Sequence, residues 1–441
     1  MRKILIVGGG YAGFYTAKKL EKWLGRREAE VTMVDPLPYM TYQPFLPEVA
    51  AGSLDPRHAL VNHRRHLKRT KVITARVTDI RHAEKTATLT PEVGEPWDIE
   101  YDIVVVTAGA VTRTFPIPGL ADQAIGLKNI EEAVSIRDRM TDNFAKASNL
   151  PPGPERDRLL TVVVVGGGFA GIEIFGELRS FASALIGKYH QLTTDDTHFH
   201  LIEAMDFIMP EVSRSTSRWV IRNLEQRAAT VHLSTQLASA VGGKIEMSNG
   251  ETFESDLIVW TAGVMANPVM RNTDLPIEER GRLRVQADLR VIDDDGVVPD
   301  AWGAGDVCAV PDLIEGQGVA GFTVPNAQHA VRQGKLMARN LTATLRGEDP
   351  QEYRHRNQGA VAGFGLYEGV YQSGGRFAVK GLIAWFMHRG YHGFAMPMWE
   401  RKIRVFANWI LAFLLRRDDV SIEARVHPRA AFEEFAARPK A

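Results

Sequence analysis

Near its start the chain reads Ile4-Leu5-Ile6-Val7-Gly8-Gly9-Gly10-Tyr11-Ala12-Gly13, and the same pattern returns as Val162-Val163-Val164-Val165-Gly166-Gly167-Gly168-Phe169-Ala170-Gly171. In each stretch an apolar strand enters a G-x-G-x-x-G turn, and a helical pattern follows. The first glycine makes the tight turn, the second lets a pyrophosphate approach the backbone, and the third packs helix against strand. One such motif is weak evidence. Two in this context predict two dinucleotides, each with its phosphates at a helix N-terminus.

An acidic residue follows each glycine motif at the end of the next predicted strand. The strand Val31–Val34 ends at Asp35, and Phe199–Ile202 ends at Glu203. A carboxylate at this place accepts hydrogen bonds from ribose hydroxyls and repels a 2′-phosphate. No Arg or Lys follows Glu203 until Arg214, which favours NAD over NADP at the second site. The alternative is that both are ordinary solvated carboxylates at strand ends.

The composition limits the classes of protein to consider. With 441 residues and 45% hydrophobic content, the chain can form two or three domains. A formal net charge of zero gives no reason to expect a nucleic acid partner. The single cysteine, Cys308, excludes an intramolecular disulfide and a C-x-x-C redox pair. No stretch reaches the roughly 18–20 apolar residues that span a bilayer, and the first strand enters the glycine turn directly, unlike a signal peptide.

A further repeat lies after each glycine motif. Residues 102–109 and 256–263 each read as an Asp, a buried parallel strand and a Thr-Ala-Gly turn. Residues 301–307 form a third strand-and-turn signature, which indicates that the chain returns to complete its first domain. Pro151-Pro152-Gly153-Pro154 is the clearest linker. These features predict an α/β fold with two Rossmann-like dinucleotide-binding domains. The first comprises residues 1–150 and 270–345, and the second comprises residues 155–269. An α-helical, partly amphipathic C-terminal region follows over residues 346–441.

The ordered set of motifs resembles the two-dinucleotide-binding flavoprotein superfamily. The set comprises the two glycine turns, the two Thr-Ala-Gly turns and Gly303-Ala304-Gly305-Asp306. Three further stretches, Tyr42–Ala50, Ala327-Gln328-His329-Ala330 and the aromatic C-terminal region, are similar to type II NADH dehydrogenases. Those enzymes are single-subunit NADH:quinone oxidoreductases that do not pump protons.

That resemblance implies a place for each cofactor. FAD would bind at the first glycine motif and NADH at the second, with the nicotinamide stacked on the flavin. The implied FAD residues are Gly8, Gly10, Tyr11, Ala12, Gly13, Asp35, Thr107, Ala108, Gly109, Gly305, Asp306, Ala327 and Gln328. The implied NADH residues are Gly166, Gly168, Gly171, Glu203, Ala262 and Gly263.

Three residues are predicted to act in catalysis by the same resemblance. Gln328 and Arg332 would face the electron acceptor, and Glu173 would lie near the nicotinamide and flavin. Glu173 can orient the nicotinamide or deliver a proton, or else only complement its helix dipole, worth about 0.3–1 kcal/mol. Arg332 departs from the family pattern A-Q-x-A-x-Q, which has Gln there, so the acceptor is less defined. Gln333 lies about 100° further round the helix and is not expected to replace it.

Other polar residues receive structural interpretations. Cys308 is read as a small buried hydrophobe rather than a redox group. His58, His63 and His66 lie in a basic segment without metal-ligand geometry and are expected to form a solvated face.

The C-terminal stretch from Arg401 to Arg417 predicts membrane contact. Its apolar run from Val405 to Leu415 is too short to span a bilayer and is bracketed by cations, which suits a helix lying in an anionic membrane surface. The alternative is a buried helix or a homodimer interface. With the family's habit, we expect a peripheral protein on the cytoplasmic side of the cell membrane, working in the respiratory chain with a membrane quinone.

Two other functions stay open on the sequence. One is a soluble NAD(P)H flavin reductase or diaphorase with a protein or small-molecule acceptor. The other is a non-catalytic flavoprotein that senses NADH.

Overall fold

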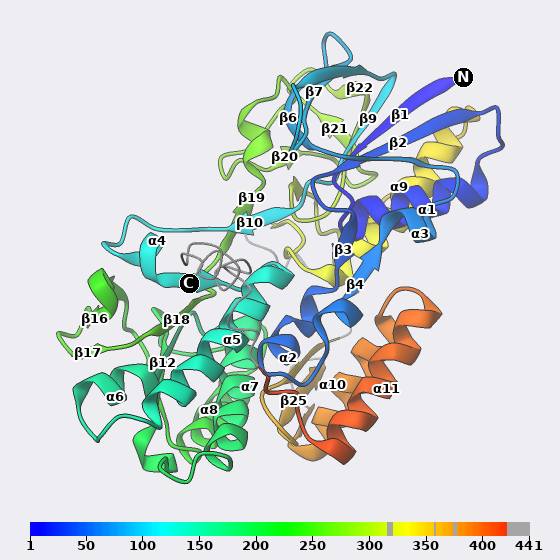
Figure 1. The fold of residues 1–441 in the computed structure, drawn as a ribbon. Helices are drawn as coiled ribbons and strands as arrows, with labels where there is room; N and C mark the ends of the chain where they lie inside the picture. Colours follow the sequence, from blue (N-terminus) through cyan, green and yellow to red (C-terminus); the bar gives the residue numbers. More distant parts are fainter. Residues whose placement is uncertain (315–320, 357–358, 374–376, 421–441) are drawn as a thin grey trace, which may run out of the picture. The chain divides into compact units, whose positions relative to one another are not determined.

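The computed structural model describes residues 1–314, 321–356, 359–373 and 377–420 (Figure 1). The chain forms two compact units, each assembled from three stretches of sequence. Unit 1 comprises Met1–Thr41, Leu60–Arg113 and Val264–Gln358. Unit 2 comprises Tyr42–Ala59, Thr114–Gly263 and Gly359–Ala441. Both are mixed α/β structures, which confirms the predicted fold class.

A six-stranded sheet forms the centre of unit 1. Its order is β21 (Arg290–Ile292), β22 (Val297–Gly303), β9 (Ile103–Val106), β1 (Arg2–Val7), β2 (Ala29–Asp35) and β5 (Lys71–Thr74). Only the pairing of β21 with β22 is antiparallel within this sheet. Strand β9 is buried along its whole length, as expected for a central parallel strand. Because β22 pairs with β9, the chain re-enters unit 1 after the second glycine motif.

Two helices of unit 1, α1 (Tyr11–Trp23) and α9 (Ala327–Leu345), pack closely together (Figure 1). A Cβ atom on Gly334 would overlap the carbonyl oxygen of Ala12, so glycine allows the two backbones to touch. The Thr16 hydroxyl lies 3.0 Å from the Gly334 carbonyl oxygen and 2.8 Å from that of Ala12. The helix that follows the first glycine motif is therefore held by a helix more than 300 residues later in the chain.

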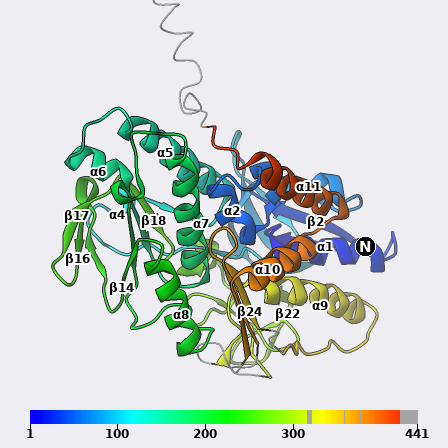
Figure 2. The ribbon, with the colours of Figure 1, turned by 90° about the horizontal axis from the view of Figure 1, so that it is seen from below.

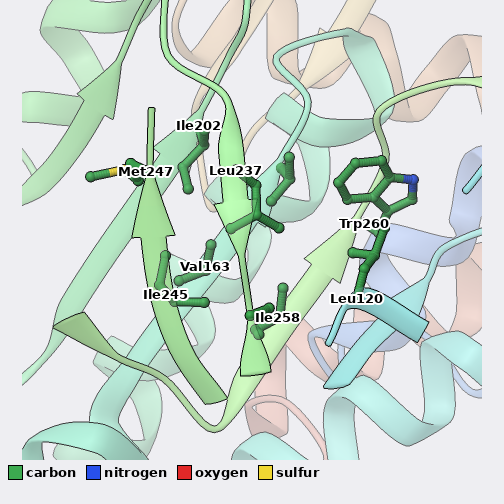
Figure 3. Packing of buried hydrophobic residues seen from close by; sticks show 10 residues of the cluster. Leu120, Val163, Ile202, Leu237, Ile245, Met247, Ile258 and Trp260 are labelled. Carbon is green, nitrogen blue, oxygen red and sulfur yellow. The ribbon is translucent and has the colours of Figure 1, made fainter. Parts of the chain in front are cut away.

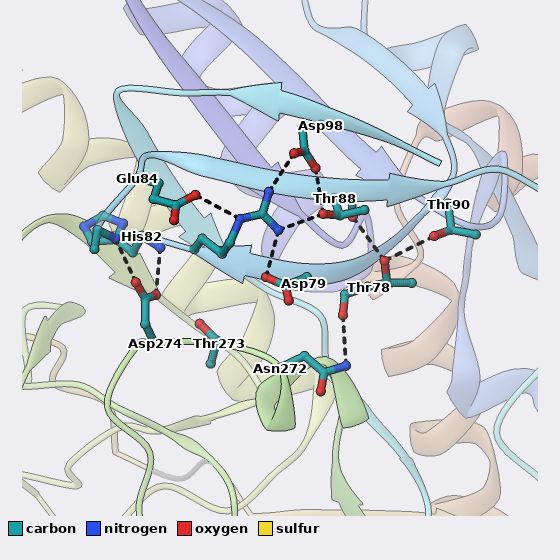
Figure 4. Close-up of polar contacts among 12 residues, drawn as sticks. Thr78, Asp79, His82, Glu84, Thr88, Thr90, Asp98, Asn272, Thr273 and Asp274 are labelled. Carbon is teal, nitrogen blue, oxygen red and sulfur yellow. Dashed lines mark hydrogen bonds and ion pairs between the residues drawn. The ribbon is translucent and has the colours of Figure 1, made fainter. Parts of the chain in front are cut away.

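The rest of unit 1 consists of short strands. They are β3 (Tyr39–Thr41), β4 (Leu60–Asn62), β6 (Arg76–Arg81), β7 (Thr86–Thr90), β8 (Trp97–Glu100), β10 (Ala110–Thr112), β19 (Val264–Ala266), β20 (Leu283–Arg284) and β23 (Cys308–Ala309). Figure 4 shows how polar side chains join the β6–β7–β8 sheet to the returning chain. Arg81 pairs with Asp98 at 2.7 Å within the sheet. The carboxylate of Asp274 accepts from the backbone N–H groups of His82 and Ala83 at 2.7 and 2.8 Å.

Unit 2 is built on a five-stranded parallel sheet. Its order is β11 (Ala124–Gly126), β18 (Leu257–Trp260), β12 (Thr161–Val165), β13 (His198–Ile202) and β14 (Ala229–His232). Its helices include α4 (Leu120–Gln123), α5 (Ile130–Ala147), α6 (Pro154–Leu160), α7 (Phe169–Ile186) and α8 (Arg214–Glu225), several of which are seen in Figure 2. The order β9–β1–β2 in unit 1 corresponds to β18–β12–β13 here, so the sequence repeat is a structural repeat.

One core of unit 2 lies between its parallel sheet and a small antiparallel sheet, β15 (Leu237–Ser239), β16 (Lys244–Met247) and β17 (Thr252–Glu254) (Figure 3). Alternate residues of β12, Val163 and Val165, face this core with Ile258 and Trp260 of β18. Ile245 and Met247 of β16 close it from the small sheet. The alternation follows from the two-residue period of a strand.

The C-terminal part of unit 2 holds a three-stranded antiparallel sheet and two helices. The strands are β24 (Ala360–Gly363), β25 (Gly369–Ser373) and β26 (Phe377–Lys380), and the helices are α10 (Leu382–Ala395) and α11 (Trp399–Leu415). The sequence predicts the helices but not this sheet. Over the described ranges, no helix combines the length and apolar character needed to cross a membrane.

The compact units divide the chain at other points than the sequence suggests. Residues 42–59 and 114–150 group with unit 2, although the sequence pattern predicts them to belong to the first domain. The segment Pro151–Pro154 joins α5 to α6 inside unit 2, so it is not a domain linker. Proline and glycine mark both kinds of connection, and only tertiary contacts distinguish them.

We expect Gly334→Ala to destabilise the protein by about 1–3 kcal/mol, because the added methyl group forces α9 away from α1. Gly390→Ala is the matched control, since a Cβ there meets no atom within 4 Å and helical alanine is favoured over glycine. Thermal unfolding should show a lower midpoint for the first variant and an unchanged or higher one for the second. Equal midpoints would contradict the close α1–α9 contact.

Candidate functional site

The first glycine loop joins β1 to α1 in a conformation that only glycine allows. Gly8 has φ +98°, and a Cβ on it would lie 2.5 Å from the Thr107 carbonyl oxygen. A Cβ on Gly13 would overlap the Gly8 carbonyl oxygen. In contrast, a Cβ on Gly10 would meet nothing within 4 Å. The first and third glycines are thus required by packing, and the second leaves open space where a pyrophosphate is predicted.

The second loop, between β12 and α7, repeats this geometry in unit 2. Gly166 has φ +110°, and a Cβ on Gly171 would overlap its carbonyl oxygen. Gly168 again has open space at its Cβ position. In each loop the open second glycine therefore directly precedes a helix N-terminus, the arrangement that dinucleotide phosphates occupy.

The two acidic residues hold their own glycine loops. Asp35 Oδ2 accepts from the Gly9 N–H at 2.6 Å, and Oδ1 accepts from Leu37 at 2.8 Å. Glu203 Oε2 accepts from the Gly167 N–H at 2.5 Å, and Oε1 accepts from the Met205 N–H at 2.7 Å. A carboxylate has about four acceptor positions, so both retain capacity for ribose hydroxyls. Neither is simply a solvated carboxylate.

His63 was expected on a solvated face, and that expectation is wrong. The side chain is fully buried on α3 (His63–His66), and Nε2 lies 2.9 Å from the Gly9 carbonyl oxygen. Burial lowers the pKa of His63 and raises that of Asp35. A neutral imidazole donating to Gly9 supports the first loop from beneath. The spacing of the basic segment carries no signal for this contact, which depends on how β4 and α3 are placed.

The Thr-Ala-Gly turns brace the same loops. The Thr107 hydroxyl lies 2.8 Å from the Gly8 carbonyl oxygen, and the Thr261 hydroxyl lies 3.1 Å from that of Gly166. Of the residues that follow, Ala108, Gly109 and Ala262 are half-buried and Gly263 is exposed. Tyr11 and Ala12, which begin α1, are buried.

The turn before α9 brings Gly305 and Asp306 to the N-terminal part of that helix. Gly305 has φ +81°, and its N–H donates to Gln333 Oε1 at 2.8 Å. Gln333 is 1% exposed and its Nε2 also donates to the Thr323 hydroxyl at 3.2 Å, so both ends of its amide form structural hydrogen bonds. Asp306 is half-buried beside this turn. As the sequence suggests, Gln333 does not take the place of the missing second Gln.

The predicted acceptor residues of α9 lie together. Ala327 and Gln328 form the first turn, and Arg332 Nη1 donates to the Gln328 carbonyl oxygen at 2.9 Å. His355 Nε2 lies 2.9 Å from Gln328 Oε1, a partner that the sequence does not indicate. With its oxygen engaged, the Gln328 amide is left with its N–H₂ group as a donor.

Glu173 lies on α7 in unit 2 and is nearly buried, at 9% exposure. Its Oε1 atom accepts from the Gly363 N–H at 3.3 Å and lies 3.0 Å from His388 Nε2. The carboxylate therefore contacts β24 and α10 of the C-terminal region. These contacts lie outside its own helix, and the histidine partner was not predicted.

Cys308 is buried, and burial raises the pKa of its thiol. Among the residues that the structure describes, no group of three or more His, Cys, Asp or Glu side chains is arranged to hold a metal ion.

Comparisons with known proteins agree with this geometry. The sequence model of a family described as pyridine nucleotide-disulphide oxidoreductase matches residues 2–334. A type II NADH:quinone oxidoreductase of Staphylococcus aureus is 29% identical over 380 residues, covering 84% of this chain and 89% of the relative. One from Staphylococcus haemolyticus is 29% identical over 375 residues with the same coverage. The solved structure of NDH2 from Plasmodium falciparum with NADH has a TM-score of 0.86 at 17% identity, covering 95% and 100% of the two chains.

Acid should destabilise the α9 end of unit 1 through His329. Burial lowers its pKa to about 4, from 6.5 when unfolded, and Nδ1 lies 2.8 Å from the Tyr353 hydroxyl. This contribution to stability is complete above pH 6.5 and diminishes as the pH falls towards 4, since the unfolded state binds the proton first. His329→Gln should therefore lose less thermal stability than the wild type between these pH values. The exposed control His190→Gln should follow the wild type.

Proposed function

Because the chain belongs to the pyridine nucleotide-disulphide oxidoreductase family, we propose that it oxidises NADH through a bound FAD and passes the electrons to a membrane quinone. The observation that carries this proposal is the pair of equivalent glycine loops, each with open space at its second glycine. The names of the type II NADH:quinone oxidoreductase relatives support the choice of substrates. The single cysteine supports electron transfer without a disulfide.

We assign FAD to unit 1 and NADH to unit 2. Unit 1 contains the first glycine loop, Asp306 and the start of α9. The N-terminus of a helix such as α9 favours the negative charge of a reduced flavin. In unit 2 the first cation after Glu203 is Arg214, and its Nη1 pairs with Asp206 at 2.7 Å. A cation engaged in this way supports NADH over NADPH.

The overall reaction is NADH + H⁺ + quinone → NAD⁺ + quinol. When bound, the flavin supplies the chemistry that accepts a hydride and releases two electrons. The chain supplies binding and polarity: the Gln328 amide and Arg332 guanidinium donate to quinone oxygens, and Glu173 supplies a proton. Arg332 adds a positive charge that favours an acceptor gaining negative charge. The proposed cycle moves no proton across the membrane.

We place the protein at the cytoplasmic face of the membrane through α10 and α11. One side of α11 is tied to unit 2, since Trp409 Nε1 donates to Glu48 at 2.7 Å and Asn408 Nδ2 donates to Ser53 at 3.1 Å. Many of the large apolar side chains of α10 and α11 are exposed, which suits insertion at headgroup depth. They are Leu382, Ile383, Phe386, Met387, Tyr391 and Phe394 on α10, and Trp399, Ile403, Ile410, Leu411, Phe413, Leu414 and Leu415 on α11.

The purified protein should carry a flavin absorption spectrum that NADH bleaches without oxygen and a short-chain quinone restores. Asp35→Ala should lose flavin, and Glu203→Ala should keep flavin but raise the KM for NADH about tenfold, equal to ~1.4 kcal/mol. Absence of flavin in the wild type would refute the cofactor assignment. Bleaching without reoxidation by quinone would favour a reductase with another acceptor or an NADH sensor.

Anionic vesicles of phosphatidylglycerol and phosphatidylcholine should bind the protein, and added salt should weaken that binding. The double change Phe413→Glu with Leu414→Glu should lower vesicle affinity by roughly tenfold or more, because two apolar contacts become charged. Val93→Glu places a charge at an exposed apolar residue outside these helices and is the control. Unchanged vesicle binding together with dissociation of a homodimer would assign the same face to dimerisation.

A further inference from the structure

After α9 ends, a segment without regular secondary structure runs back along the same helix. The fully buried side chain of Asn340 on α9 donates to the Gln351 carbonyl oxygen at 2.8 Å and accepts from the Gln351 N–H at 3.0 Å. Nearer the start of the helix, His329 Nδ1 lies 2.8 Å from the Tyr353 hydroxyl. The segment is therefore fixed to α9 at two points, both within unit 1.

This segment brings His355 to the first turn of α9. Its Nε2 atom lies 2.9 Å from Gln328 Oε1, and its half-buried ring stands edge-on to that of His329 with centroids 5.6 Å apart. Burial and the positive charge of Arg332 lower the pKa of His355, which favours a neutral imidazole. A neutral imidazole has one N–H group, and an amide oxygen only accepts hydrogen bonds. The contact therefore places that N–H on Nε2.

The contact determines what the Gln328 amide offers to a ligand. Oε1 accepts from His355, whereas Nε2 of Gln328 has no partner among the residues that the structure describes. The last torsion of a glutamine side chain is broad and roughly two-fold, so an unsupported amide presents its oxygen about as readily as its N–H₂ group. A quinone oxygen accepts hydrogen bonds and is repelled by an amide oxygen. Holding Oε1 keeps the amide in the orientation that donates.

We propose that His355 is a positioning residue that fixes the Gln328 amide with its N–H₂ group free to donate to the electron acceptor. This inference rests on the proposed function, in which that amide binds a quinone oxygen. His355 acts through Gln328 alone and exchanges no proton with the acceptor. Because the amide is ordered before the acceptor arrives, less free energy is lost in ordering it during binding.

The test compares a variant that lacks the donor with one that keeps it. His355→Leu should raise the KM for a short-chain quinone about three- to tenfold with a smaller change in kcat, as expected for the loss of one hydrogen bond. His355→Gln retains an N–H₂ donor and should recover most of the wild-type KM. Arg354→Gln is the matched control, because Arg354 is exposed on the same segment and pairs with Glu352 at 2.8 Å. Its quinone kinetics should equal those of the wild type.

Two further measurements separate positioning from a purely structural role. Bleaching of the flavin by NADH and its reoxidation by ferricyanide should be unchanged in His355→Leu, since neither requires a hydrogen bond from this amide to a quinone. On a Gln328→Leu background, His355→Leu should cause little further rise in the KM for quinone, because both changes remove one interaction. His355→Ala also lacks the donor and serves if His355→Leu does not fold.

The outcomes distinguish this inference from the function on which it rests. A wild-type KM for quinone in His355→Leu, or equal slowing with quinone and ferricyanide, would overturn the role of His355 alone. Additive effects of His355→Leu and Gln328→Leu would overturn it too. A wild-type protein whose reduced flavin is reoxidised by ferricyanide but by no quinone would overturn the proposed function.

Discussion

The two nucleotide loops depend on one steric constraint, the approach of a helix backbone onto the turn that precedes it. Any side chain at Gly13 or Gly171 would overlap a carbonyl oxygen of its own loop. The constraint lets each helix start directly behind the turn, next to the open second glycine. Burial of the central strands then fixes where those helix ends point, because both loops leave the middle of a parallel sheet.

Around each loop the same three supports recur. A carboxylate holds the amide of the middle glycine, a threonine hydroxyl binds the first carbonyl group, and the central strand has the same two neighbours. The units differ in what is added to this frame. Unit 1 adds His63 beneath its loop and α9 against α1, whereas unit 2 adds the polar cluster around Glu173.

The C-terminal helices serve two chemical purposes in unit 2. Their outward side carries large apolar residues, and their inward side carries His388, Arg389 and Trp409 against carboxylates of α2 (Leu46–Ala50) and α7. Buried ion pairs of this kind contribute little net stability, because desolvation offsets much of the attraction. Their value is in fixing which side of each amphipathic helix faces inward. Neighbouring residues of α10, His388 and Arg389, contact Glu173 of α7 and Glu48 of α2. Trp409 of α11 donates to the same Glu48.

The sequence alone determined the strand–turn–helix units, their pairing with Asp35 and Glu203, and the return of the chain at Gly305, because each follows from local periodicity or from a backbone position that only glycine can occupy. Tertiary structure alone decided the rest. His63, expected at the surface, is buried and contacts the first glycine loop. The side chain of Gln333 accepts a hydrogen bond from the Gly305 N–H, and Glu173 contacts His388, more than 200 residues later in the chain. Such contacts join segments distant in sequence, and no local pattern encodes which buried polar group will meet which partner.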